Sequence, residues 1–180
     1  MFTRRLVVGL AAGALLLAAV TSTAFAQTTP AQTEGPYFKA SSPERTSLID
    51  AGVSGTPLVI TGRVLTPDGQ PVANALLDVW QADAGGNYDN SGYTLRGHQY
   101  TDDNGNYQLE TVVPGLYPGR TRHIHVKVQA PNGPVLTTQL YFPGEPANAR
   151  DGIFNPNLVL NLQQTDQGAT ATFDFVVNTA

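Results

Sequence analysis

Short runs of alternating apolar and polar residues, separated by turn sequences, recur along this 180-residue chain. The run at 58–65 leads into the turn Pro67-Asp68-Gly69, and a second run follows at 75–81. The same pattern recurs where 99–101 and 107–112 flank the turn Asp102-Asp103-Asn104-Gly105, and both places predict β-hairpins. Further strands are expected at 126–128, 135–142, 158–162 and 171–177. Short strands with closely spaced turns are typical of a sandwich, so we expect an all-β fold, an antiparallel β-sandwich.

The N-terminal segment has the pattern of a secretory signal. Met1 to Arg5 form a short basic region, an uncharged apolar stretch follows at 6–20, and Ala24-Phe25-Ala26 gives a small-x-small cleavage pattern. We therefore expect a signal peptide at 1–26, an exported mature protein and no membrane span in that mature form. Thr3-Arg4-Arg5-Leu6-Val7-Val8 matches a twin-arginine signal in part, so both the general secretory and the twin-arginine routes stay open.

The charge and cysteine content of the chain limit the functions that it can have. Loss of Arg4 and Arg5 with the signal would change the formal net charge from −4 to −6, which disfavours nucleic acid as a partner. The chain has no cysteine, so it forms neither disulfides nor thiolate metal sites. The mature chain, about 150 residues long, corresponds to one domain by the usual size range.

The mature chain divides by pattern into two parts. Residues 27–56 lack periodicity and predict an extended N-terminal arm, which we expect to pack on the sandwich at 57–180 because Tyr37 and Phe38 are costly to leave in water. Two long connections, 82–96 and 143–157, interrupt the strands. Long loops in a compact domain tend to be functional, so we expect them to be active-site loops.

Two of the three histidines stand one residue apart, at His123 and His125, with Tyr117 six positions before the first. On a strand both imidazoles lie on one face, and Ile124 lies on the other. Imidazole is the commonest metal ligand, so the pair predicts half of a metal site. The spacing also fits an ordinary polar strand face, and it leaves the metal open.

Motifs spread over most of the mature chain resemble the intradiol ring-cleavage dioxygenases, which open catechol rings between the two hydroxyls. They are Thr33-Glu34-Gly35-Pro36-Tyr37, Trp80-Gln81-Ala82-Asp83, Gly86-Asn87-Tyr88, Leu95-Arg96-Gly97, Thr101-Asp102, Pro114-Gly115-Leu116-Tyr117, Arg120, His123-Ile124-His125 and Thr138-Gln139-Leu140-Tyr141-Phe142. The resemblance implies a non-haem Fe(III) ion held by Tyr88, Tyr117, His123, His125 and a solvent hydroxide. Anionic phenolate oxygen suits this hard ion.

The resemblance also implies roles in the reaction of a catechol-type substrate with O2 to a muconate-type product. Tyr117 would leave the metal as substrate binds and accept a proton. Arg120 would stabilise negative charge on the reacting ring carbon, and Gln139 would orient the substrate. Arg122 is expected to form a surface ion pair. The resemblance leaves open the identity of the catechol and whether the chain forms an oligomer.

Two other functions fit parts of the pattern. A transthyretin-like or carboxypeptidase-regulatory sandwich would share the strand and turn motifs and serve as a binding module, because fold alone does not decide function. A zinc or copper site built from His98, His123 and His125 would leave Tyr88 and Tyr117 unexplained. We otherwise expect His98 to be structural or exposed and Trp80 to pack in the sandwich core. For Tyr37 we favour packing over the alternative, a position at the substrate mouth.

Overall fold

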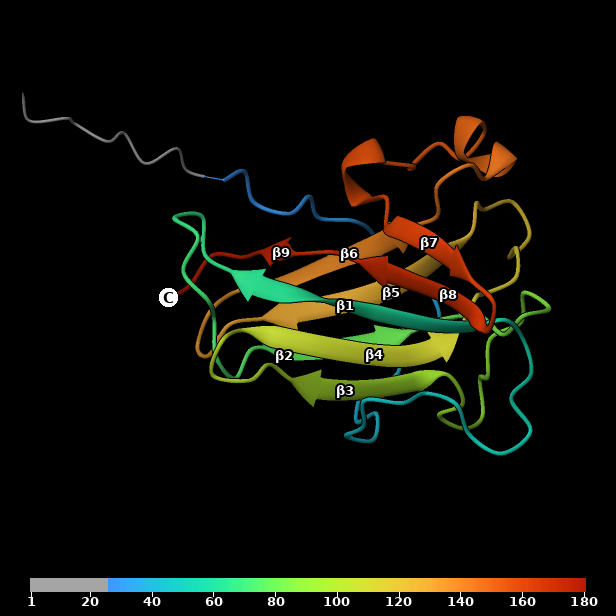
Figure 1. Ribbon diagram of the computed structural model, residues 1–180, viewed down its shortest axis with the longest axis horizontal. Helices are drawn as coiled ribbons and strands as arrows, with labels where there is room; N and C mark the ends of the chain where they lie inside the picture. The colour runs from blue at the N-terminus through green and yellow to red at the C-terminus, as the bar shows by residue number, and fades with distance from the viewer. Residues whose placement is uncertain (1–25) are drawn as a thin grey trace, which may run out of the picture.

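The computed structural model describes residues 26–180, and these residues form two stacked β-sheets (Figure 1). Except for Ala26, the predicted signal peptide lies outside the described residues. No helix within 26–180 is long and apolar enough to cross a membrane. The elements are β1 (Pro57–Leu65), β2 (Leu76–Trp80), β3 (Arg96–Tyr100), β4 (Asn106–Val112), β5 (His123–Gln129), β6 (Val135–Tyr141), the 3-10 helices η1 (Pro146–Ala149) and η2 (Pro156–Leu158), β7 (Asn161–Thr165), β8 (Gly168–Thr172) and β9 (Phe175–Val176).

The prediction of an all-β sandwich is confirmed. One sheet has the order β4-β1-β8-β7, with β9 also paired to β1, and the other has the order β3-β2-β5-β6. Neighbouring strands are antiparallel except for β1, which runs parallel to both β8 and β9. Two-residue alternation directs one face of each sheet into a shared apolar core.

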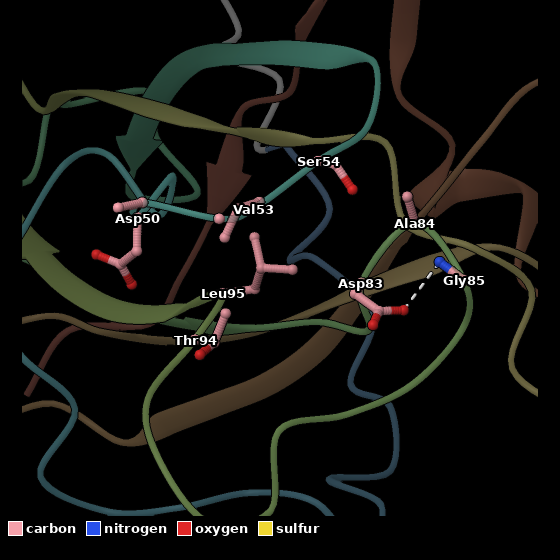
Figure 2. Close-up of a pocket in the computed structure, with 10 residues that line it drawn as sticks. Asp50, Val53, Ser54, Asp83, Ala84, Gly85, Thr94 and Leu95 are labelled. Atoms are coloured by element: carbon pink, nitrogen blue, oxygen red, sulfur yellow. Dashed lines mark hydrogen bonds between the residues drawn. The ribbon is translucent and has the colours of Figure 1, made fainter.

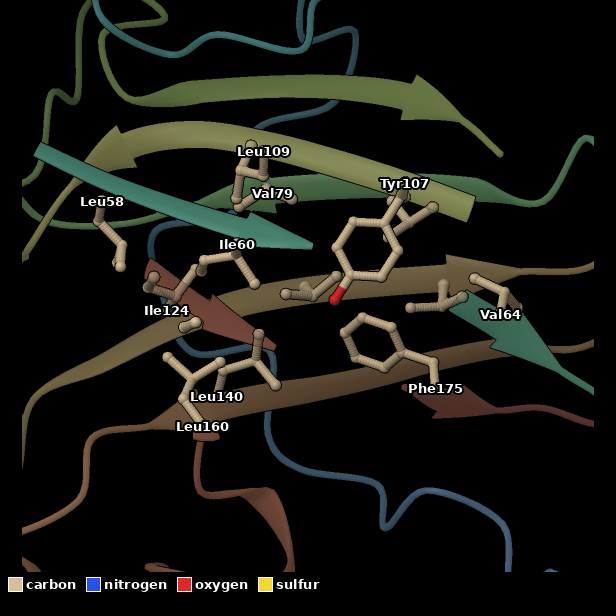
Figure 3. Packing of buried hydrophobic residues seen from close by; sticks show 14 of the residues in the cluster. Leu58, Ile60, Val64, Val79, Tyr107, Leu109, Ile124, Leu140, Leu160 and Phe175 are labelled. Atoms are coloured by element: carbon tan, nitrogen blue, oxygen red, sulfur yellow. The ribbon is translucent and has the colours of Figure 1, made fainter. Parts of the chain in front are cut away.

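The core shows why the histidines point away from the sandwich interior. Ile124 of β5 belongs, with Ile60 of β1 and Leu109 of β4, to the cluster of buried apolar side chains (Figure 3). Val126 and Val128 belong to the same cluster. Their alternation turns His123, His125 and Lys127 to the opposite face of the strand, where loops and the arm cover them.

The two predicted hairpins are wrong as strand pairs. β1 pairs with β4, whereas β2 pairs with β3 and β5, so the turn at 66–70 connects strands of different sheets. The turn at 102–105 likewise connects β3 to β4 across the sandwich. Each turn reverses the chain locally, as the isolated bridge between Leu65 and Pro71 shows. The strand after each turn joins the facing sheet and does not pair with the strand before the turn. The observed hairpins are β5–β6 and β7–β8.

Two strand boundaries also differ from expectation. The predicted strand at 158–162 begins only at Asn161, because Asn155 caps the 3-10 helix that Pro156 opens. The predicted strand at 171–177 is divided between β8 and β9.

Residues 26–56 cover exposed strand edges. Glu44 bridges to His98 on β3, and Ser47 bridges to Glu110 on β4, so one stretch of the arm joins the neighbouring edges of both sheets. Gln32 donates its backbone N–H to Thr137 on β6, the opposite edge of the second sheet. Covering edge strands removes sites for unwanted strand pairing. The same course carries Thr33 to Lys39 across the outer face of β5.

Candidate active site

His123 and His125 bring their Nε2 atoms together on the outer face of β5. The two nitrogens are 3.2 Å apart, and the Tyr88 hydroxyl lies 3.3 Å from Nε2 of His123. Both histidines are buried, with 4% and 3% of their surface exposed. Three of the four predicted metal ligands therefore converge on one point.

The ring of His123 is oriented by its own backbone. Its Nδ1 donates a hydrogen bond of 2.6 Å to the carbonyl of Thr121, which leaves the lone pair on Nε2 free to bind a metal. Burial lowers the pKa of His123 to about 4, and burial also holds the pKa of His125 well below its ordinary value. Both imidazoles are therefore neutral near pH 7, the state that a metal ligand requires.

His125 is oriented by packing. The Trp80 ring stacks on it with ring centroids 4.8 Å apart and planes 8° from parallel. On another side lies Gly35 of the arm, where an added Cβ would stand 3.3 Å from Cε1 of His125. Nδ1 of His125 has no hydrogen-bond partner within 26–180. Trp80 is buried, as expected, but it packs against this candidate ligand and Phe38 rather than inside the main apolar cluster.

Tyrosines from three separate segments complete the group. Tyr88 comes from the long connection between β2 and β3, Tyr117 from the connection before β5, and Tyr37 from the arm. Tyr37 stacks on Tyr88 with centroids 4.4 Å apart and planes 13° from parallel, and its hydroxyl lies 2.7 Å from that of Tyr117. Tyr117 touches Tyr88 edge-on at 5.8 Å. The Tyr117 hydroxyl is thus joined to the arm rather than directly to the histidines.

Packing was the favoured expectation for Tyr37, with a place at the substrate mouth as the alternative, and the structure makes it part of the site. The signal available in the sequence was its place in Gly35-Pro36-Tyr37-Phe38, two large aromatic residues in a polar segment. Its bond with Tyr117 raises the pKa of Tyr37, with burial adding to the shift. Burial likewise raises the pKa of Tyr88, against the opposing charges of Arg120 and Arg96.

Arg96 fixes the arm to the Tyr88 loop. Arg96 is only 1% exposed, and its Nη1 donates a hydrogen bond to the carbonyl of Tyr37 at 2.5 Å. Nε and Nη2 both donate to the carbonyl of Asp89, at 3.2 and 2.9 Å. One guanidinium therefore holds the backbone beside both stacked rings. Arg96 belongs to the motif Leu95-Arg96-Gly97, which by itself predicted no role for it.

Arg120 and Gln139, predicted from distant positions, are hydrogen-bonded. Nη2 of Arg120 donates to Oε1 of Gln139 at 2.7 Å, and Nε donates to Oδ2 of Asp151 at 2.8 Å. Gln139 in turn donates from Nε2 to the Thr33 carbonyl of the arm at 2.9 Å. Asp151 comes from the long connection after β6 and was missed from the sequence. Its pairing with Arg120 spans 31 residues and has no local pattern.

The remaining candidates lie outside this group. Nδ1 of His98 on β3 is 3.2 Å from the Ser42 hydroxyl. No three His, Cys, Asp or Glu side chains of residues 26–180 gather as a possible metal site, so the zinc or copper site of His98, His123 and His125 does not form. Arg122 makes an ion pair with Glu145 at 3.1 Å.

Two pockets lie along the loop that carries Tyr88. One has a volume of about 350 Å³ and includes Asp50, Ser54, Asp83, Thr94 and Leu95 in its wall (Figure 2). The other, of about 270 Å³, shares Asp83, Thr94 and Leu95 with it and reaches Tyr88. The Asp83 carboxylate accepts backbone N–H groups from Gly85 and Asn87 at 2.8 and 2.9 Å. It thereby shapes the turn immediately before Tyr88.

The donor set fits a hard, highly charged metal ion. Two neutral imidazole nitrogens stand within contact of one another, and two phenols can each become anionic when a cation is bound. Beside them, Arg120 offers positive charge in a fixed position. Such an arrangement can bind and activate an oxygen-rich aromatic ligand.

Known proteins are similar to this chain in sequence and fold. The sequence model of a family described as dioxygenase matches residues 33–179. The dioxygenase domain of a dioxygenase and carbohydrate-binding protein fusion from Streptomyces sp. SirexAA-E is 55% identical, with a TM-score of 0.83 over 86% of this chain and 100% of that chain. The 3-chlorocatechol 1,2-dioxygenase of Rhodococcus opacus 1CP is 30% identical, with a TM-score of 0.78 over 84% and 73%.

Curated relatives match over part of their length. Protocatechuate 3,4-dioxygenase beta chain of Burkholderia cepacia is 39% identical over 56% of this chain and 50% of the relative. Catechol 1,2-dioxygenase 2 of Acinetobacter lwoffii is 37% identical over 66% and 52%. This chain spans between 50% and 62% of the first three such relatives. The family match over 33–179 and these similarities show that the chain belongs to the intradiol ring-cleavage dioxygenase family.

Proposed function

We propose that this protein is a non-haem Fe(III) dioxygenase that opens the ring of a catechol-type substrate between its two hydroxyls. O2 is the second substrate, and the product is a muconate-type diacid. The observation that carries the proposal is the convergence of Tyr88, His123 and His125 beside the fixed guanidinium of Arg120. A pure binding module has no need of that group, so the alternative of a transthyretin-like or regulatory sandwich is not favoured.

Tyr88, Tyr117, His123 and His125 would hold the ferric ion. Phenolate oxygens stabilise Fe(III) over Fe(II) better than neutral nitrogen does, which accounts for two tyrosines in a metal site. When bound, the ion would draw electron density from a chelated catecholate and make its ring reactive toward O2.

The chain's own residues would accept a proton, stabilise charge and fix position. Tyr117, whose hydroxyl lies 2.7 Å from that of Tyr37, would take one proton from the catechol and stay hydrogen-bonded to the arm. Arg120 would stabilise the negative charge that develops on the ring carbon attacked by O2. Gln139, bonded to both Arg120 and the Thr33 carbonyl, would hold the guanidinium in place.

We further propose that residues 1–26 direct export. The basic, apolar and small-residue regions of this segment support that assignment. Expression of the full chain followed by mass spectrometry of the protein outside the cytoplasm should find a chain that begins at Gln27. Recovery of the uncleaved chain from the cytoplasm alone would contradict export.

Colour and product together test the function. Protein loaded with ferric ion should be red-brown from phenolate-to-iron charge transfer, and Tyr117→Phe should shift that absorbance. Tyr100→Phe is the matched control, because Tyr100 is half-exposed on β3 and lies outside the site. A colourless protein that binds zinc in its place would overturn the proposal. A coloured protein that forms no muconate from any catechol of a substrate panel would also overturn the catalytic claim.

A further inference from the structure

Three cations at or beside the candidate site have acidic partners within the described part of the chain. Arg120 pairs with Asp151 at 2.8 Å, and Arg122 pairs with Glu145 at 3.1 Å. Lys127, two residues after His125 and on the same strand face, pairs with Glu34. These pairs matter because catechol-type substrates differ chiefly in ring substituents, and a carboxylate substituent needs a cation to replace its lost water.

The Arg120–Asp151 pair is the one closest to the expected reaction. The Asp151 side chain is only 2% exposed. Its Oδ2 accepts from Nε of Arg120 and the backbone N–H of Thr121, both at 2.8 Å, and its Oδ1 accepts from Ile153 at 3.1 Å. Burial would raise the pKa of Asp151, but these hydrogen bonds outweigh it and lower that pKa. The carboxylate therefore stays ionised and compensates the positive charge of Arg120.

Arg96 is a further cation near the ligands, and its guanidinium is not accessible to substrate. It is 1% exposed, and its three nitrogens donate to the backbone carbonyls of Tyr37 and Asp89. A substrate carboxylate could reach it only by breaking the contacts that hold the stacked tyrosines.

Leu116, Ile153 and Glu34 are exposed on the adjoining loops, and the basic Arg150 is exposed beside Asp151. Leu116, next to Tyr117, is 46% exposed, and Ile153, two residues after Asp151, is 39% exposed. The Glu34 side chain on the arm is 46% exposed. Apolar side chains favour an uncharged ring, and Glu34 holds Lys127 in an ion pair.

We propose that the site selects catechols whose ring carries no carboxylate. The inference rests on the proposed function and deepens it, because it distinguishes catechol-type substrates with a ring carboxylate from those without one. The names of the relatives do not decide the matter, since they include both catechol and protocatechuate dioxygenases.

The test compares protocatechuate (3,4-dihydroxybenzoate) with its methyl ester, which removes the charge of the substituent. The ester is also one methyl group larger and withdraws electrons more strongly, and unsubstituted catechol controls for both differences. Calorimetry without oxygen measures binding to the ferric protein, and product formation under oxygen measures kcat/KM. We expect the ester to bind at least about 10-fold more tightly and to be cleaved at least about 10-fold more efficiently, which corresponds to about 1.4 kcal/mol. Unsubstituted catechol should behave like the ester.

Asp151→Asn supplies the internal check. The substitution keeps the shape of the side chain and an oxygen acceptor but leaves the charge of Arg120 uncompensated. The affinity for the acid relative to the ester, and the corresponding ratio of kcat/KM values, should therefore each rise several-fold. Asp174→Asn is the matched control, because Asp174 pairs with Arg63 on the exposed end of the first sheet. Its ratio should equal that of the wild type.

The possible outcomes distinguish failure of the charge selection from failure of the dioxygenase function. Equal or better binding and cleavage of the acid by the wild-type protein would overturn the charge selection and leave the dioxygenase function intact. Failure of catechol and ester alike to bind and react would overturn the proposed function and this inference with it. An unchanged ratio in a folded Asp151→Asn protein would overturn the role given to Asp151.

Discussion

Gly35 is the position at which one added carbon tests how the arm holds His125. The residue has φ of +71°, and a Cβ there would stand 3.3 Å from Cε1 of the imidazole. The substitution Gly35→Ala therefore has two effects, one on the backbone and one on the candidate ligand. Gly69→Ala separates them, because Gly69 has φ of +81° and its Cβ would meet no atom within 4 Å.

The backbone effect should be similar in both variants. An L-residue in the left-handed region costs roughly 1–2 kcal/mol, and the restricted unfolded chain returns about 0.4–1 kcal/mol, so each variant should lose about 1 kcal/mol of unfolding free energy. The second effect belongs to Gly35 alone. Carbon atoms pack best at about 3.5–4.0 Å, so the added methyl must displace the imidazole or the arm by a few tenths of an ångström.

Displacement of His125 should appear in metal affinity. Changes in the groups that orient a metal ligand typically cost about 10–100-fold in affinity, so Gly35→Ala should bind ferric ion at least about 10-fold more weakly than Gly69→Ala. Urea denaturation of the metal-free proteins measures the shared backbone term. Competition against a soluble chelator measures the affinity of each folded protein for iron.

The comparison can refute the reasoning in two ways. Equal iron affinity in Gly35→Ala, Gly69→Ala and the wild type would show that the arm does not hold His125. A loss of stability in Gly35→Ala far greater than in Gly69→Ala, with unchanged iron affinity, would show that the contact serves folding alone.

Three further predictions concern the surroundings of Trp80, Tyr88 and Asp89. Trp80→Phe keeps an aromatic face against His125 and should retain more ferric affinity than Trp80→Leu in the chelator competition; equal losses would contradict the stacking role. Burial keeps Tyr88 protonated without metal, so Tyr88→Phe should release one proton fewer than the wild type on loading from the same ferric complex, measured by pH-stat. Backbone N–H groups of residues 91, 92 and 94 lower the pKa of Asp89, so its charge stabilises the fold above about pH 4 and this contribution fades as pH falls. Asp89→Asn should therefore be less stable than the wild type at pH 7, with a smaller difference near pH 3 in urea denaturation.

Local sequence patterns correctly predicted the features that depend on neighbouring residues, namely the alternation of side chains along a strand and the positions of turns. The alternation of His123, Ile124 and His125 follows from strand geometry, and the structure places the middle residue in the core and the other two outside it. The turns at 67–69 and 102–105 were also visible in the sequence. Their chemistry reverses the chain but does not decide which sheet the next strand joins, which is why both predicted hairpins failed.

Long-range contacts explain what was missed. Tyr37 meets Tyr117 across 80 positions, and Arg96 meets the Tyr37 carbonyl across 59. No periodicity links such residues, because the path of the arm over the sheets brings them together. Trp80 was predicted to pack in the core from its strand pattern, and only the register of β2 against β5, which pairs Trp80 with His125, reveals its second role.

The most direct test of the central claim is the isotopic composition of the product. Iron-loaded protein should be given catechol under oxygen-18 gas, and the product should be analysed by mass spectrometry. We expect a muconate that carries two labelled oxygen atoms, because both atoms of O2 enter the product at the carbons that bore the hydroxyls. A product cleaved outside the hydroxyl pair, or a muconate without label, would contradict it.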